Sequence, residues 1–177
     1  MEGRKKQTRR KEVKHSGIYS RCMLSQPVNL NVKYIGKNLK SVLERSVKSS
    51  IEGKCIVEGF VKAESVKIIS YSCGVVHGEY VKFDVALECL VCYPVEGMVI
   101  NCVARNITKA GIRAESSEET PSPVVCFISR DHHVNSSQFN SINDGDKFQC
   151  RVIGQRFEIY ETYVSILGEL VIEKKII

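Results

Sequence analysis

The stretch that decides the fold is residues 94–115, which read Pro94-Val95-Glu96-Gly97-Met98-Val99-Ile100-Asn101-Cys102-Val103-Ala104-Arg105-Asn106-Ile107-Thr108-Lys109-Ala110-Gly111-Ile112-Arg113-Ala114-Glu115. From position 98 to 104 the even-numbered residues are all small or apolar, which is the period-2 pattern of a strand with one buried face. The Lys-Ala-Gly segment at 109–111 predicts a tight turn, and residues 112–115 predict a short second strand.

Three further strands follow this hairpin. Residues 116–123 form a polar, proline-containing loop, and residues 124–129 are apolar and predict the third strand. A short helical turn is expected at 136–142, before a fourth strand that begins after Gly145 and a fifth at 163–172. Five short strands with a helical turn between the third and fourth is the order of an OB-type barrel.

The segment before the barrel has a different pattern. Residues 18–24 and 27–34 are expected to be extended, and residues 36–38 open a helix that Gly53 ends. Residues 54–62 and 65–73 predict one strand each. The clearest strand is 80–91, about twice the usual length of five or six residues, and we expect it to run from this segment into the barrel. The helix has one apolar stripe, at Leu39, Val42, Leu43, Val47 and Ile51.

The fold class expected is therefore an α+β N-terminal unit followed by an all-β five-stranded OB-type barrel, joined by a long strand. The expected boundaries are a disordered basic tail at 1–15, an α+β domain at 16–93 and an OB-fold domain at 94–177. The notable charge is in the tail, where seven Lys/Arg and two Glu give +5 of the total +6. Such a tail is either a nucleic-acid-binding or nuclear-targeting arm or a solubilising extension.

Charge within the folded segments argues against a general nucleic-acid binder. Residues 16–94 carry ten Lys/Arg and seven Asp/Glu, net +3, whereas residues 95–177 carry nine and eleven, net −2. A general binder should concentrate positive charge on its folded domain. RNA contact by the barrel would therefore have to rest on a local cluster of basic residues.

No catalytic, metal or cofactor motif is found. The eight cysteines lie mostly in apolar runs, as expected for reduced core residues. Cys89 and Cys92 have zinc-like spacing, but positions i and i+3 of a strand point to opposite faces, so we expect no metal there. Cys126 near His132 is expected to be a core residue rather than a nucleophile. We expect no cofactor and no membrane span.

Four segments resemble a known family. They are Pro94-Val-Glu-Gly-Met-Val-Ile-Asn-Cys-Val, Asn106-Ile-Thr-Lys-Ala-Gly-Ile-Arg-Ala-Glu, Val125-Cys-Phe-Ile-Ser-Arg and Gly145-Asp146. These four segments, together with the order of an α+β unit before a barrel, resemble the stalk subunit of multisubunit DNA-directed RNA polymerases. The resemblance covers residues 17–172. That family includes the seventh subunit of the eukaryotic enzyme II and the archaeal E-prime subunit. Residues 51–55 and 128–133 are more similar to versions from large cytoplasmic DNA viruses.

The resemblance implies a noncatalytic polymerase subunit that acts in transcription. The α+β end would dock on other RNA polymerase subunits, and the barrel could contact nascent RNA leaving the enzyme. The family's subunit pairs with a small helical partner. An intracellular location follows, either the nucleus or a cytoplasmic viral factory, with packaging in a virion as a further option. One departure is that Ile112 and Arg113 stand where the cellular pattern has an aromatic residue.

The candidate RNA-binding residues are five, expected to meet where the turn after the first barrel strand approaches the end of the third: Lys109, Arg113, Arg130, His132 and His133. Arg151, Arg156, Phe157 and Tyr160 could extend this cluster. The alternative is that these side chains form only a solvated rim of the barrel and bind no RNA. At the level of function, the alternatives are a free-standing OB-fold RNA-binding protein in translation or RNA decay, and an enzyme that uses the barrel to bind substrate.

Overall fold

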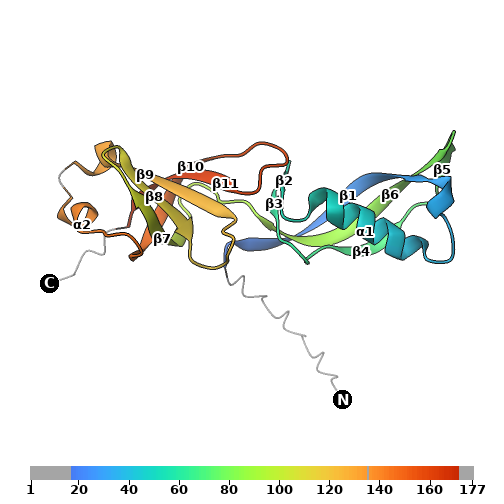
Figure 1. The fold of residues 1–177 in the computed structure, drawn as a ribbon, viewed down its shortest axis with the longest axis horizontal. Helices are drawn as coiled ribbons and strands as arrows, with labels where there is room; N and C mark the ends of the chain where they lie inside the picture. Colours follow the sequence, from blue (N-terminus) through green and yellow to red (C-terminus); the bar gives the residue numbers. More distant parts are fainter. Residues whose placement is uncertain (1–16, 135, 172–177) are drawn as a thin grey trace, which may run out of the picture.

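The computed structural model describes residues 17–134 and 136–171, so the expected tail at 1–15 lies outside the described residues. The molecule is elongated, with a barrel at one end and a long, narrow sheet at the other (Figure 1). The first unit contains β1 (Tyr19–Asn31), η1 (Val32–Tyr34), α1 (Leu39–Ile51), β2 (Cys55–Ile56), β3 (Gly59–Val61), β4 (Lys67–Tyr71), β5 (Val75–His77) and β6 (Tyr80–Cys92). The barrel unit contains β7 (Val99–Ile107), β8 (Gly111–Ser116), β9 (Val124–Ser129), η2 (Arg130–His133), α2 (Ser137–Asn140), β10 (Lys147–Arg156) and β11 (Val164–Leu170).

The first sheet is built on β6. Its whole length pairs antiparallel with β1, from Tyr19 opposite Cys92 to Asn31 opposite Tyr80. Its other edge pairs with β5, β4 and β3 in succession. The predicted alternation is confirmed, because the odd-numbered residues of β6 from 81 to 91 are buried and the even-numbered ones are exposed or half-buried.

Helix α1 covers one face of this sheet and packs against β1 and β4 (Figure 1). Leu43, Val47 and Ile51 form its buried stripe, as predicted. Burial of side chains of this size contributes about 1.5 to 3 kcal/mol each. Gly53 follows the helix with φ +70°, the left-handed conformation expected just after a helix. The opposite face of α1 is not covered by any described element.

The five-stranded barrel is closed in the order β7-β8-β9-β11-β10, with β10 pairing back to β7. Strands β9 and β11 are parallel and every other pair is antiparallel. This is the OB order first-second-third-fifth-fourth, so the predicted fold class is confirmed. Its interior is filled by alternate residues of the five strands, namely Ile100, Cys102, Ala104, Ile112, Ala114, Val124, Cys126, Ile128, Cys150, Val152, Val164 and Ile166.

The end of β6 joins the two units, as the length of this strand predicted. Cys89 belongs to the core beneath α1, whereas Cys92 packs into the core of the barrel together with Phe60. Backbone bonds tie the units further, since the N–H of Cys55 donates to the carbonyl of Glu161 at 2.7 Å and the N–H of Tyr160 donates to the carbonyl of Cys55 at 2.8 Å.

Two local predictions are wrong. Residues 54–62 form the β2–β3 hairpin instead of one strand, because Gly59 has φ +125° and a Cβ there would lie 2.5 Å from the carbonyl oxygen of Cys92. Residues 18–34 hold one continuous strand, β1, and then η1, instead of two extended segments. Pro27 is tolerated within β1 because β1 is at the edge of the sheet.

Candidate nucleic-acid interface

A row of three side chains crosses the outer surface of the barrel. Arg113 on β8 lies opposite Phe127 on β9, and Phe127 lies opposite Leu167 on β11. Their neighbours Ile112 and Ile128 point into the barrel, so the alternation of each strand turns this row outward. Phe127 is 39% exposed and Leu167 is 37% exposed. The row is an open apolar strip with a cation at one end.

This row lies on the surface that OB barrels commonly use for single strands, the outer face of the second and third strands. An exposed aromatic ring can stack on a base, and a neighbouring guanidinium can meet a phosphate. Among the described residues Arg113 makes no ion pair, so its charge is available to a ligand. The pattern suits a single-stranded ligand better than a duplex, because stacking requires an unpaired base.

Lys109 lies at the tip of the β7–β8 turn, exposed to solvent. The Thr108 hydroxyl holds this turn by donating to the carbonyl of Gly111 at 3.0 Å. Gly111 is required for close packing, since a Cβ there would lie 2.2 Å from the carbonyl oxygen of Ile128. The turn therefore carries Lys109 on a rigid base at the end of the barrel.

The guanidinium of Arg130 is occupied by internal contacts. Nε donates to the Lys109 carbonyl at 3.0 Å, and the terminal nitrogens donate to the Asn140 side chain at 3.0 Å and the Thr108 carbonyl at 3.4 Å. It also lies over the ring of Phe139, 5.2 Å from its centroid. Arg130 thus joins the β7–β8 turn to α2, a role that charge alone would not reveal.

His133 is buried and engaged on both ring nitrogens. Nδ1 lies 3.0 Å from the carbonyl oxygen of Ser129, and Nε2 accepts from the backbone N–H of Leu170 at 3.1 Å. Since a carbonyl can only accept, Nδ1 carries the proton. The ring also stacks on Phe139 with a centroid distance of 5.0 Å. His133 therefore closes the end of the barrel, whereas its neighbour His132 is exposed.

The structure brings four of the five predicted RNA-binding residues together and places the fifth apart from them. Lys109, Arg130, His132 and His133 gather where the β7–β8 turn meets η2, and Arg113 lies further along β8 on the strand face. RNA binding by any of them stays a prediction. The residue that sequence reasoning missed is Phe127. It sits in a wholly apolar run, and only the alternation with its inward-facing neighbours distinguishes it as an outward side chain.

The proposed extension of the cluster does not form. Arg151 pairs with Glu169 at 3.1 Å, and Arg156 pairs with Glu158 at 3.2 Å. Phe157 packs edge-on against another aromatic ring, that of Tyr93, at 6.1 Å. Tyr160 lies in the β10–β11 loop, whose backbone bonds to β2 of the first unit. These side chains therefore belong to local pairs and to the junction between the units.

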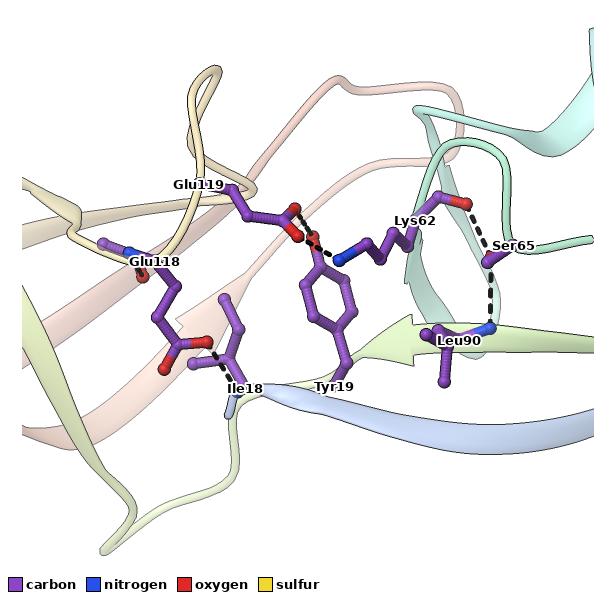
Figure 2. Close-up of polar contacts among 8 residues, drawn as sticks. Ile18, Tyr19, Lys62, Ser65, Leu90, Glu118 and Glu119 are labelled. Atoms are coloured by element: carbon purple, nitrogen blue, oxygen red, sulfur yellow. Dashed lines mark hydrogen bonds and ion pairs between the residues drawn. The ribbon is translucent and has the colours of Figure 1, made fainter. Parts of the chain in front are cut away.

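The junction between the two units contains a polar cluster, drawn in Figure 2. The hydroxyl of Tyr19 on β1 donates to Glu119 at 2.7 Å, and Lys62 forms an ion pair with the same carboxylate. The ammonium of Lys62 also lies 4.8 Å from the centroid of the Tyr19 ring. The neighbouring carboxylate of Glu118 accepts from the backbone N–H of Ile18 at 3.1 Å.

This environment shifts the pKa of two groups in opposite directions. Burial, followed by the hydrogen bond to the Glu119 carboxylate, raises the pKa of the Tyr19 phenol well above its usual value. Burial acts to raise the pKa of Glu119, but the hydrogen bonds from Lys62 and Tyr19 prevail and hold it below its usual range. The neutral phenol and ionised carboxylate therefore favour the same hydrogen bond.

Beside this cluster a cleft of about 820 Å³ separates the units. Its wall on the first unit includes Gly53 and Lys62, and its wall on the barrel includes Arg113. The cleft therefore leads from the outer strand face of the barrel to the end of α1.

The described residues contain no group of three or more His, Cys, Asp or Glu side chains placed to hold a metal ion. Cys89 and Cys92 face different cores, in agreement with the argument from strand geometry. Cys126 lies fully buried inside the barrel, where hydrogen bonding to other cysteines and burial raise its pKa. None of the described helices has the length and apolar character to span a membrane.

The end of the first unit opposite the barrel exposes apolar side chains. Val75 and Val76 of β5 are 56% and 68% exposed, and Tyr80 at the start of β6 is 52% exposed. Tyr34 of η1 is 64% exposed and lies at the same end, since Val32 donates to the carbonyl of Glu79 in the β5–β6 turn. These four residues, Tyr34, Val75, Val76 and Tyr80, are called the tip below.

Comparison with curated proteins gives matches along most of the chain. It is 24% identical to DNA-directed RNA polymerase II subunit rpb7 of Dictyostelium discoideum over 178 residues, which cover 85% of this chain and 100% of that protein. It is 24% identical over 163 residues to the Glycine max protein of the same name, covering 82% and 89%. A protein of Acanthamoeba polyphaga mimivirus named for a DNA-directed RNA polymerase subunit is 28% identical over 136 residues, covering 75% of this chain and 60% of that protein. No protein-family model matches.

Proposed function

We propose that this chain is a noncatalytic subunit of a DNA-directed RNA polymerase, of the family of the seventh, stalk-forming subunit of RNA polymerase II that its relatives represent. The first unit, residues 16–93, docks on other polymerase subunits, and the barrel domain, residues 94–177, projects away from them. The observation that carries this proposal is the match along the full length of the Dictyostelium relative. Catalysis and its metal ions are supplied by other subunits.

The tip supports docking through the first unit. Four large apolar side chains exposed at one end of a molecule mark a surface that a partner covers. The tip is also the point farthest from the barrel along the long axis (Figure 1). A chain anchored there would hold the barrel at a distance from the polymerase core.

Affinity purification from cells that express the tagged protein tests this function. The wild type should recover the large polymerase subunits, and Val76→Asp should lose them, because a buried charge without a partner disfavours an interface. Val57→Asp is the matched control, since Val57 is 74% exposed but lies in the β2–β3 turn. Recovery of no large subunit by the wild type would overturn the proposal.

We further propose that the barrel contacts nascent RNA through Arg113, Phe127 and Lys109. The exposed ring and unpaired guanidinium support stacking and phosphate contact, as described above. The barrel sequence is net −2, so the contact should be weak and sensitive to salt. Arg130 and His133 support this site by fixing the β7–β8 turn and α2, and exposed His132 stands at its edge.

A gel shift with single-stranded RNA tests the barrel contact. The double variant Lys109→Ala with Arg113→Ala should lose most binding, and Phe127→Ala should weaken it by about 1 to 3 kcal/mol, the usual contribution of one stacked base. Lys147→Ala is the control, because Lys147 is exposed on β10 and away from this row. Binding by the double variant as tight as that of wild type would remove the cluster.

A small helical partner is the remaining part of the proposal. It is supported by an open edge of the first sheet, since β1 pairs only with β6 among the described strands. Met23 on that strand is 71% exposed, which gives a partner an apolar contact. Co-purification of a small protein with the wild type but not with Met23→Asp would support the partner.

We also propose an intracellular location, in the nucleus or a viral factory, with packaging in a virion as the alternative.

A further inference from the structure

The positive charge of the first unit is concentrated on α1 and the turn that leads into it. Residues 33–48 contain five basic residues and one acidic residue, net +4, whereas residues 16–94 as a whole are net +3. The rest of the first unit is therefore slightly acidic. The five are Lys33, Lys37, Lys40, Arg45 and Lys48.

Leu43, Val47 and Ile51 of α1 point into the core, and Arg45 and Lys48 lie off this buried stripe. Lys40 is exposed in the first turn although it lies three and seven positions before Leu43 and Val47, and Lys33 and Lys37 precede the helix. From Lys40 to Lys48 the row extends about 12 Å at the usual helical rise of ~1.5 Å per residue. The basic face of α1 is defined here as Lys37, Lys40, Arg45 and Lys48.

Part of this charge is balanced locally, because Glu44 and Glu52 line the same groove of α1 as Arg45 and Lys48. Lys48 pairs with Glu44 at 2.8 Å, and Lys40 also helps to lower the pKa of that carboxylate. Within the described residues Lys37 and Arg45 form no ion pair. The nearest further acid on the helix side is Glu52, whose carboxylate accepts from the backbone N–H of Val66 at 3.1 Å. A partner for the basic face must therefore bring its own negative charge.

We propose that the basic face of α1 is a second contact for single-stranded RNA, continuous with the barrel face. The helix ends at Gly53, which lines the same 820 Å³ cleft as Lys62 and Arg113. A strand that lies on Arg113 and Phe127 and places its phosphates along α1 has to pass Glu64, Glu115 and Glu119, which also line this cleft. The last two carboxylates are already paired, with Arg105 and Lys62.

This inference rests on the proposed RNA contact of the barrel and extends it. Two linked sites on one strand reinforce each other, because binding at the first raises the local concentration of the strand at the second. A long RNA should therefore bind more tightly than the slightly acidic barrel would allow alone. An acidic protein surface is the competing occupant of the basic face.

Fluorescence anisotropy with a labelled single-stranded RNA of about 25 nucleotides, long enough for several contacts, tests the proposal on the full chain. Lys40→Gln with Arg45→Gln should weaken binding about tenfold. It should also reduce the slope of log K against log salt by about 1.4, because each phosphate that a side chain neutralises on a single strand adds ~0.7 to that slope. Lys67→Gln with Lys82→Gln removes the same charge from the opposite face of the sheet and should change neither.

The outcomes separate the two proposals. Equal loss of affinity in the α1 and control variants, or no loss in either, overturns the α1 site. Unchanged RNA binding by the α1 variant together with failure to recover the polymerase assigns the face to an acidic protein and overturns it too. Tighter binding of a 25-base-pair DNA duplex through these residues overturns the single-strand assignment. Weaker binding by the α1 variant but not by Arg113→Ala and Phe127→Ala supports the α1 site and refutes the barrel contact.

Discussion

The hydroxyl of Tyr19 donates a 2.7 Å hydrogen bond to the carboxylate of Glu119, although the two residues are 100 positions apart in the chain. Tyr19 begins the long strand β1, and Glu119 lies in the loop between β8 and β9 of the barrel (Figure 2). Lys62 pairs with the same carboxylate from the first unit. One carboxylate therefore receives both contacts, and it helps to fix the angle between the barrel and the first unit.

Glu119→Gln should lower the free energy of unfolding by about 1 kcal/mol, because it weakens the ion pair with Lys62 while keeping an acceptor for Tyr19. Urea denaturation followed by circular dichroism measures this change. Glu158→Gln is the control, since its partner Arg156 is 83% exposed and the pair lies away from the cluster. An equal effect of both substitutions would mean that Glu119 acts as an ordinary surface charge.

Acid should weaken the same contact. The pKa of Glu119 is lowered in the fold from the ordinary glutamate value of 4.5, so its ionised form is the one that the fold stabilises. The stability it contributes is complete above pH 4.5 and is lost as the pH falls through the lower, folded-state pKa. The difference in unfolding free energy between wild type and Glu119→Gln should therefore be constant from pH 5 to 7 and shrink below about pH 4.5. A difference that grows on acidification would contradict this assignment.

Most of the fold can be predicted because the strands alternate cleanly. The period-2 pattern of β6 and the glycine turns of the barrel predict nearly correct elements. The β2–β3 hairpin escapes prediction because Gly59 sits inside an apolar run that looks like one strand. The Tyr19–Glu119 contact cannot be predicted, since no local signal links residues 100 positions apart.

The site is harder to predict than the fold. A count of charges indicates which residues are basic, but it does not show which of their donors are already used. Arg130 donates to two backbone carbonyls and an amide, and His133 is buried between two backbone groups. Phe127 escapes notice because an aromatic residue among apolar neighbours suggests core. Only the barrel's register shows that it points outward beside Arg113.

Gly168→Ala should destabilise the barrel by about 1 to 3 kcal/mol, the usual effect of overpacking a core. A Cβ at Gly168 would lie 2.0 Å from the sulfur of Cys150 and 3.1 Å from that of Cys126. Thermal unfolding of the variant measures the loss of stability. Cys150→Ala in the same chain removes the nearer sulfur and should restore part of the stability. No restoration would show that the cost arises from the remaining close atoms, the backbone carbonyl oxygen of Arg151 on β10 at 3.0 Å and the sulfur of Cys126.

Substitution of His133 should lower the stability of the fold, whereas substitution of Arg113 should weaken RNA binding. His133→Ala removes the acceptor of the Leu170 N–H and the partner of Ser129, so it should cost about 2 kcal/mol or more through unsatisfied buried groups. Arg113→Ala leaves those hydrogen bonds intact and should change the melting temperature little while weakening RNA binding. Melting curves and anisotropy titrations on both variants, at a temperature where both are folded, make the comparison. If folded His133→Ala lost RNA binding as fully as Arg113→Ala, binding would depend on His133 itself or on the position of α2 that it supports through Phe139, and the expected separation of the two effects would be wrong.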